Sequence, residues 1–206
     1  MFKTKAQNNK GFSLLEIIVA LGVFSIVVVV AAGALLKIVD AGKKAQAMKA
    51  VMNNLHFAME SMSREIRTGT KYRCAATLAG LNTQIDSNSP AECEINDAVA
   101  RFFAFEPAVF RDLTNPDERY AYRYNTTTKA LEKAESISGN FNESDFEPVT
   151  SSEVEILEMR FLVTGTAAND QEPGKVLVTI RGNAGVKSRL QSEFTMHSTI
   201  TQRIRE

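Results

Sequence analysis

Charge is absent from a long stretch near the N-terminus of this sequence. Residues 17–36 contain no charged side chain, and Ser25 supplies their only hydroxyl group. A helix built from this stretch is about 30 Å long, which is the hydrocarbon thickness of a bilayer. The stretch therefore predicts a helix that can span a membrane.

The sequence also has no net charge, since its 24 basic side chains balance its 24 acidic ones. No basic cluster lies outside the flanks of the apolar stretch, so the chain alone offers no electrostatic footprint for nucleic acid.

Glycine-rich phosphate loops, GxSxG and HExxH motifs are absent as well, and no catalytic residue or cofactor is predicted. His56 and His197 have no acidic or nucleophilic neighbour in the sequence, and we interpret both as structural.

Cysteine is scarce, with only Cys74 and Cys93. The absence of a CxxC spacing and of a neighbouring histidine makes a metal site the weaker interpretation. An extracytoplasmic compartment would let the two cysteines pair, so a disulfide is favoured over two separate thiols.

Two oxygen-rich loops also lack the D-x-D-x-D spacing of calcium sites, and we interpret them as solvated. Their members are Asp112, Asn115, Asp117 and Glu118 in the first loop, and Asn142, Glu143, Asp145 and Glu147 in the second.

Proline does not occur between Phe12 and Pro90, so nothing breaks a helix there. Gly33 and Gly42 are the expected weak points of this helix. Gly69 is the expected stop, because basic residues precede it in the last turn. A helix over 12–68 would be about 85 Å long.

The second half of this helix is amphipathic. Its apolar side chains lie three or four residues apart and predict a core face: Met48, Val51, Met52, Leu55, Met59, Met62 and Ile66.

Beyond Gly69 the pattern changes to strands. Residues 70–97 are polar and predict a loop, with a short helix around 75–81. A strand is predicted over 99–105, followed by a hairpin of 119–124 and 130–134 around a turn. Three further strands, at 154–163, 175–182 and 189–201, predict an antiparallel meander, with Gly182–Gly185 separating the last two. One helix followed by strands that cover its apolar face gives an α+β architecture.

One carboxylate, Glu16, interrupts the apolar N-terminal segment. The stretch Lys10-Gly11-Phe12-Ser13-Leu14-Leu15-Glu16 follows a short lysine-containing leader and precedes the apolar helix. It resembles the class III signal of type IV pilins and pseudopilins. An ordinary signal anchor is the alternative interpretation. A secretory signal peptide fits less well, because the apolar run is too long and the glycine precedes it.

The resemblance implies that prepilin peptidase cleaves between Gly11 and Phe12, that Phe12 is then N-methylated, and that Glu16 contributes to assembly. It also implies a pilin fold, with a long N-terminal helix packed against an antiparallel β-sheet. The expected regions are a leader at 1–11, a transmembrane half-helix at 12–36, an amphipathic half-helix at 37–68 and a globular α+β domain at 69–206. In a filament, the new Phe12 amine of one subunit could pair with Glu16 of another. The alternative interpretation is that Glu16 extends toward the lipid headgroups.

Lysines flank the apolar run on both sides, so only the resemblance places the leader in the cytoplasm and the C-terminal domain outside the inner membrane. It implies other pilins or pseudopilins, the inner-membrane assembly platform and membrane lipid as partners. Later stretches resemble minor pilins or the J-type minor pseudopilin of type II secretion: LHFAMESMSREIR at 55–67, the hairpin at 120–133, and FTMHSTITQR at 194–203.

The expected function is therefore that of a minor structural subunit of a type IV pilus or of a secretion pseudopilus. A monomeric, membrane-anchored module that binds a secreted substrate or a surface ligand is the alternative. The sequence does not distinguish a secretion pseudopilus from a type IV pilus or a competence filament.

Overall fold

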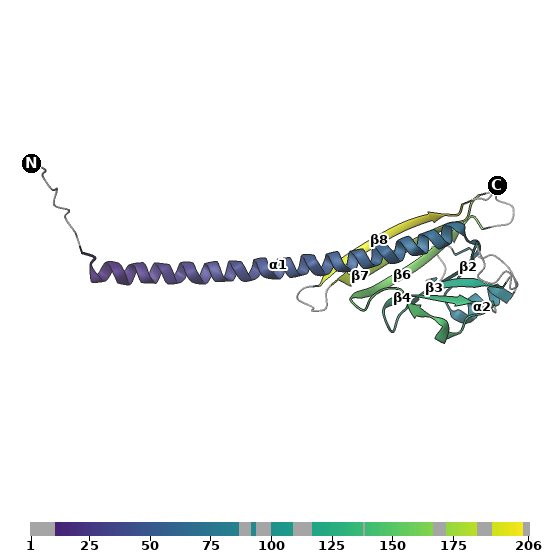
Figure 1. Cartoon of the computed structure of the whole chain (residues 1–206), viewed down its shortest axis with the longest axis horizontal. Coiled ribbons are helices and arrows are strands. Elements are labelled where there is room, and N and C mark those ends of the chain that lie inside the picture. The colour runs from purple at the N-terminus through teal and green to yellow at the C-terminus, as the bar shows by residue number, and fades with distance from the viewer. Residues whose placement is uncertain are drawn as a thin grey trace, which may run out of the picture. The chain divides into compact units, whose positions relative to one another are not determined.

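The computed structural model describes residues 11–86, 92–93, 100–108, 117–137, 139–166, 172–184 and 191–203. The chain divides into two compact units, Met1–Lys43 and Lys44–Glu206, and Figure 1 labels the elements of both. Helix α1, Leu14–Thr68, runs through both units. All the other elements belong to the second unit.

In the first unit, α1 continues without a break through Gly33. A side chain at this glycine or at Gly42, just before the second unit, would meet no other atom within 4 Å. The large apolar side chains between Phe12 and Val39 are 45% to 78% exposed. An 18-residue window of α1 has a mean hydropathy of 2.9, and none of this window is buried. The helix is therefore long and apolar enough to cross a membrane.

In the second unit, the predicted core face of α1 is confirmed. Leu55, Met62 and Ile66 are completely inaccessible to solvent, and Val51 and Met59 are almost so. The two remaining members of the predicted stripe, Met48 and Met52, are partly buried and pack against the same core. The three- to four-residue spacing thus identified the side of the helix on which the sheets pack.

The predicted end of α1 is also confirmed, because its last helical residue is Thr68. The Gly69 amide donates to the carbonyls of Glu65 and Ile66, at 3.1 and 3.0 Å. A Cβ atom at Gly69 would lie 2.3 Å from the Phe105 ring. Glycine is therefore required here for the close approach of that ring.

The prediction of a loop directly after Gly69 was wrong, because Thr70–Ala75 forms strand β1. The strand was missed because it does not alternate: its last four residues are all buried, and one of them is Arg73. The short helix predicted around 75–81 lies further along, as α2 at Leu78–Asp86. Its buried residues Leu81 and Ile85 show the helical spacing.

Sheet A is antiparallel and has the strand order β1-β2-β3-β4-β5. The predicted hairpin is confirmed, with Arg119 opposite Ser136 and Asn125 opposite Ala130. Strand β2 begins later than predicted, and residue 99 lies outside the described residues. The bounds are β2 Phe102–Glu106, β3 Arg119–Asn125, β4 Ala130–Ser136 and β5 Glu147–Pro148, with the 3-10 turn η1 at Glu143–Asp145.

Sheet B is the predicted antiparallel meander, in the order β6-β7-β8. Its strands are β6 Val154–Thr164, β7 Lys175–Ala184 and β8 Ser192–Thr201. Gly182 does not end β7, contrary to the prediction, because the strand continues to Ala184. A Cβ atom at Gly182 would lie 2.6 Å from the Glu155 carbonyl oxygen and 2.8 Å from the Phe194 ring, so this glycine allows a close approach within the sheet.

The core of the second unit lies between α1 and the two sheets. Buried side chains from α1, sheet A and sheet B form one cluster, in which the Phe103 ring stacks on Phe105 and on Phe161. A smaller cluster lies beneath α2. Figure 1 shows the C-terminal part of α1 running along β6, β7 and β8. The fold is α+β, with a long N-terminal helix packed against antiparallel sheets, and it is consistent with the pilin fold.

Candidate functional site

The residues of the expected cleavage site lie directly before α1. Gly11 and Phe12 are exposed, and neither is part of a helix or strand. The Ile17 amide donates to the Ser13 carbonyl at 3.2 Å, so Ser13 is the residue that caps the helix. The bond between Gly11 and Phe12 is therefore outside the hydrogen-bonded helix, where a peptidase can reach an extended backbone.

Glu16 lies in the first turn of α1 and is exposed. The partial positive charge at a helix N-terminus stabilises a carboxylate in this position. Ser13 and Glu16 also have the S-x-x-E spacing of a capping box, in which the acid can accept from the backbone amide of the cap residue. Capping of α1 by Glu16 is a prediction from this spacing, which is visible in the sequence.

Cys74 and Cys93 form a disulfide, with their Cα atoms 6.1 Å apart. Cys74 belongs to β1 of sheet A, and Cys93 pairs with Val163 of β6 in sheet B through reciprocal backbone hydrogen bonds of 3.1 and 3.3 Å. Both cysteines are buried. The disulfide thus joins the two sheets on one side of the core.

A buried charged cluster surrounds Glu106 at the end of β2. Its carboxylate lies 3.1 Å from the Lys71 ammonium, 3.3 Å from the Arg119 guanidinium and 3.9 Å from the Arg73 guanidinium. Arg73 is completely inaccessible to solvent. Burial lowers the pKa of Arg73, while the negative charge of Glu106 opposes that shift. The Glu106 carboxylate therefore pairs with three cations in a place where unpaired charge is costly, and Arg119 also pairs with Asp117 at 3.8 Å.

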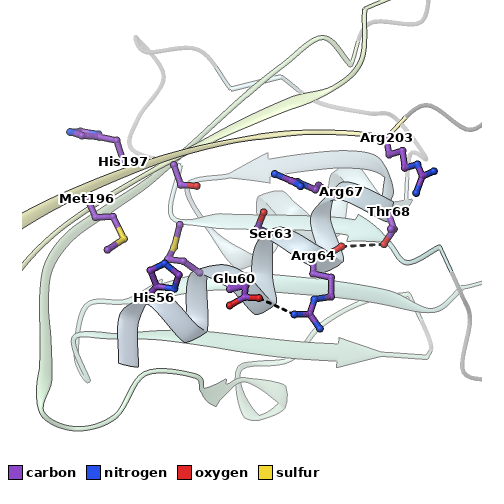
Figure 2. A pocket seen from close by; sticks show the side chains of 11 residues that line it. His56, Glu60, Ser63, Arg64, Arg67, Thr68, Met196, His197 and Arg203 are labelled. Atoms are coloured by element: carbon purple, nitrogen blue, oxygen red, sulfur yellow. Dashed lines mark hydrogen bonds and ion pairs between the residues drawn. The ribbon is translucent and has the colours of Figure 1, made fainter. Parts of the chain in front are cut away.

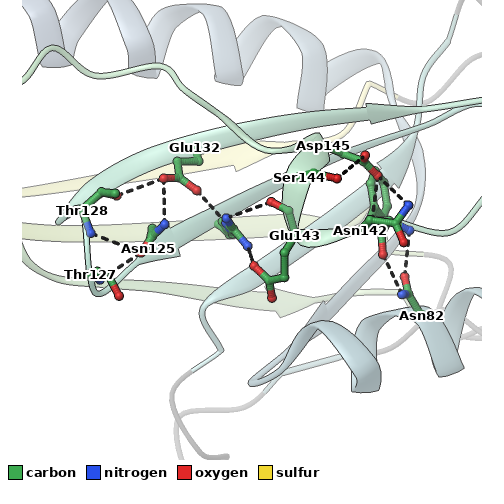
Figure 3. Close-up of polar contacts among 11 residues, drawn as sticks. Asn82, Asn125, Thr127, Thr128, Glu132, Asn142, Glu143, Ser144 and Asp145 are labelled. Carbon is green, nitrogen blue, oxygen red and sulfur yellow. Dashed lines mark hydrogen bonds and ion pairs between the residues drawn. The ribbon is translucent and has the colours of Figure 1, made fainter.

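A second polar cluster holds the β3–β4 hairpin, and Figure 3 shows it. The Arg123 Nε atom lies 2.7 Å from Glu132 Oε2, and the same guanidinium pairs with Glu143 and lies 4.0 Å from the centre of the Phe146 ring. Asn125 donates to Glu132 at 2.8 Å. The Glu143 carboxylate thus forms an ion pair with Arg123 within the fold.

The second oxygen-rich loop contains this Glu143, and its Asp145 accepts from the Asn142 amide at 2.7 Å. In the first loop, Asp112 and Asn115 lie outside the described residues. Among the residues that the structure describes, no group of His, Cys, Asp and Glu side chains is arranged to hold a metal ion.

A groove of about 590 Å³ separates the end of α1 from β8 (Figure 2). Met59 and Met196 line it together with three arginines, Arg64, Arg67 and Arg203. Among the described residues that line it, Glu60 is the only acidic one. These residues are His56, Met59, Glu60, Ser63, Arg64, Arg67, Thr68, Met196, His197, Ser198 and Arg203.

The two histidines, interpreted from the sequence as structural, lie on opposite sides of this groove. The His197 Nδ1 atom is 3.1 Å from the Thr179 hydroxyl oxygen. His56 is exposed on α1. Their role as structural residues stays a prediction.

Comparison with known proteins identifies the N-terminal motif. Residues 6–32 match the family model described as "Prokaryotic N-terminal methylation motif". No curated protein and no solved structure matches the chain. The motif and the apolar helix support a membrane-anchored, type IV pilin-like protein, and the signal implies processing by prepilin peptidase and assembly with other pilins in general. The motif is the prepilin-type signal shared by type IV pilins and pseudopilins.

Proposed function

We propose that this protein is a minor structural subunit of a type IV pilus or of a type II secretion pseudopilus. Prepilin peptidase cleaves it between Gly11 and Phe12, and Phe12 is methylated at its new amine. The subunit stays in the inner membrane through residues 12–36, with its C-terminal domain outside the cytoplasm. The assembly platform then extracts it into the filament. In this proposal the protein has no catalytic activity and binds no cofactor.

The observation that carries this proposal is the position of the signal. The methylation motif at 6–32 lies in the part of the chain, from Phe12 to Val39, where the large apolar side chains of α1 and of the residues just before it are exposed. Exposed apolar side chains of this number need lipid or other apolar helices around them. The helix of a pilin-like subunit meets both environments in turn. It is surrounded by lipid in the membrane and then by the helices of neighbouring subunits in the filament.

Sequencing of the mature N-terminus tests the proposal. We expect mature protein from the native envelope to begin at Phe12, with a methylated amine. Gly11→Asp adds a side chain at the scissile bond and should leave the leader attached. Asn9→Asp is the matched control, because it adds the same charge two residues earlier and should be cleaved normally. A mature chain that begins at any residue other than Phe12 would overturn the assignment.

The second candidate function is a monomeric, membrane-anchored binding module. The groove between α1 and β8 is the observation that favours it, because three arginines line it: Arg64, Arg67 and Arg203. Crosslinking in the native membrane distinguishes the two functions. A structural subunit should be crosslinked to other proteins that carry the same signal, whereas a monomeric module should be recovered without them.

A further inference from the structure

The sheet edges of this protein differ in how readily they can accept another strand. Unpaired edges bind extra strands unless proline, lysine, a bulge, short length or a covering element prevents it. Strand β5 has only two residues, of which one is Pro148. Strand β1 contains Lys71 at a positive φ of 52°, has an irregular register and is tied by its disulfide. Both edges of sheet A are therefore protected.

In sheet B, one edge is protected and the other is open. Strand β6 has a register shift between Ile156 and Glu158, and its outer side bonds to Cys93, Ala100 and Lys129. Strand β8, by contrast, pairs with β7 over all ten of its residues without a shift. It contains neither proline nor lysine. Within the described residues, β8 pairs with no strand other than β7.

The groove beside this open edge carries positive charge that the fold does not neutralise. Arg64 is paired with Glu60 at 3.1 Å, which accounts for the only acid in the lining. The guanidinium groups of Arg67 and Arg203 make no hydrogen bond or ion pair with the residues that the structure describes. The Arg203 backbone amide donates to the Arg67 carbonyl at 2.8 Å, so the backbones of the two residues lie side by side at one end of the groove, while their side chains point in different directions (Figure 2).

We propose that the groove between α1 and β8 is a docking site for an extended, acidic segment of a partner protein. The segment adds to the open edge of β8 as a further strand, and its backbone supplies the hydrogen bonds. Its carboxylates bind the guanidinium groups of Arg67 and Arg203, which point in different directions at that end of the groove (Figure 2), and its apolar side chains contact Met59 and Met196. The proposal does not depend on the N-terminal signal or on assembly into a filament.

A second copy of this chain fits the same edge poorly. In a pair of β8 strands from two copies, the only carboxylate available from β8 is Glu193. That carboxylate already binds Arg181 at 3.1 Å. A copy would therefore leave Arg67 and Arg203 without an anion, whereas an acidic segment supplies one.

Nuclear magnetic resonance of methionine methyl groups tests the proposal on the full chain in detergent micelles. Met59 and Met196 report on the groove, while the completely buried Met62 and Met159 are internal controls. The probe is the blocked peptide acetyl-Thr-Val-Glu-Val-Glu-Val-amide. We expect it to shift the Met59 and Met196 signals saturably at millimolar concentration and to leave those of Met62 and Met159 unchanged.

Two control peptides separate the charge from the strand geometry. Replacing both glutamates by lysine should abolish the shifts. Methylating alternate backbone nitrogens of the acidic peptide should abolish them too, because these nitrogens can no longer donate to β8. Equal shifts with either control peptide, or none with the acidic peptide, would overturn the proposal.

Charge-reversed variants locate the anion. The double variant Arg67→Glu, Arg203→Glu should bind the acidic peptide at least about tenfold more weakly and should bind the lysine peptide instead. Unchanged Met62 and Met159 signals show that it is folded. The matched control Lys44→Glu, Lys49→Glu reverses two exposed charges elsewhere on α1 and should bind like the wild type. Wild-type shifts that depend on protein concentration without peptide would identify a second copy as the occupant and refute the acidic segment.

Discussion

The Glu65 carboxylate on α1 accepts a hydrogen bond from the Tyr122 hydroxyl on β3, with 2.8 Å between Oε2 and Oη. The other oxygen of Glu65 lies 2.9 Å from the Lys133 ammonium on β4. A single carboxylate thus joins the helix to both strands of the hairpin. Burial and the neighbouring charge of Glu65 raise the pKa of Tyr122 well above its ordinary value.

Tyr122→Phe should make the protein less stable at neutral pH but less sensitive to alkali. At pH 7 the loss of the hydrogen bond to Glu65 should cost about 1–2 kcal/mol. Above pH 10 the unfolded chain loses the tyrosine proton while the folded chain retains it, so wild-type stability falls by up to about 1.4 kcal/mol per pH unit from this group. The variant lacks this contribution. Denaturant unfolding of the full chain in detergent, at pH 8 and at pH 11, measures both effects.

Glu65→Gln provides the control for that prediction. Burial is the largest cause of the raised Tyr122 pKa, and burial remains when the carboxylate is replaced by an amide. Glu65→Gln should therefore retain most of the loss of stability above pH 10. If it removes that loss as completely as Tyr122→Phe does, the negative charge of Glu65 and not burial controls the pKa of Tyr122.

The Lys133 ammonium also makes the stability of the fold depend on pH in the alkaline range. Burial lowers its pKa, but the hydrogen bonds to Glu135 and Glu65 outweigh that effect, and the net shift is upward. A base with a raised pKa stabilises the folded state at all pH values below its unfolded pKa. That stabilisation is lost as the pH rises through the folded pKa. Lys133 and Tyr122 therefore both predict alkaline destabilisation.

Glu106→Leu should be among the most destabilising substitutions in the second unit. It removes the carboxylate that pairs with three cations, among them the buried Arg73 guanidinium, which should cost about 3–5 kcal/mol. Chemical denaturation of the full chain in detergent measures the loss. Glu60→Leu is the matched control, because Glu60 and its partner Arg64 are 59% and 77% exposed, and its effect should stay below about 1 kcal/mol. Equal effects at the two positions would show that burial of the Glu106 cluster adds nothing.

These clusters explain which parts of the fold could be predicted from the sequence. The face of α1, the hairpin and the meander follow from periodicity, because each element buries one side of its own surface. Strand β1 does not, since the charge of its buried Arg73 is compensated in part by Glu106, which comes from a strand about 30 residues later in the chain. The close approach at Gly182 likewise depends on both neighbouring strands. Contacts between distant segments leave no local pattern in the sequence.

The candidate functional sites also differ in whether they could be predicted from the sequence. Gly11, Phe12 and Glu16 form a contiguous motif, so they could be identified by reading along the chain. The groove between α1 and β8 requires Arg67 and Arg203, which are more than 130 residues apart and meet only because β8 ends beside α1. Its basic character was therefore not visible in a sequence with no net charge.

Loss of the disulfide should destabilise the second unit. Cys74 and Cys93 close a loop with a sequence separation of 19, and such a cross-link should contribute about 3 kcal/mol. Cys74→Ser together with Cys93→Ser should lose about that amount in denaturant unfolding of the full chain. In wild-type protein from the native envelope, both cysteines should be alkylated only after reduction. Alkylation of both thiols without reduction would contradict the disulfide.

Glu16 provides the sharpest test of assembly. In the proposed assembly, cleavage leaves an α-amine on Phe12, and a neighbouring subunit brings its own amine to this carboxylate. In a low-dielectric environment the two charges compensate each other, and a misaligned neighbour would leave both unpaired. Assembly, and not folding or membrane insertion, should therefore depend on Glu16.

Glu16→Gln and Glu16→Leu together separate this charge pair from the capping role of the same residue. Glutamine can occupy the capping-box position that leucine cannot, but neither side chain carries charge. We expect both variants to be cleaved and inserted into the membrane, and both to be crosslinked to neighbouring subunits far less than wild type at equal membrane abundance. If Glu16→Gln is crosslinked normally and Glu16→Leu is not, the residue acts by capping α1. Normal crosslinking of both variants would show that Glu16 is not an assembly contact, as expected for a side chain that extends to the lipid headgroups.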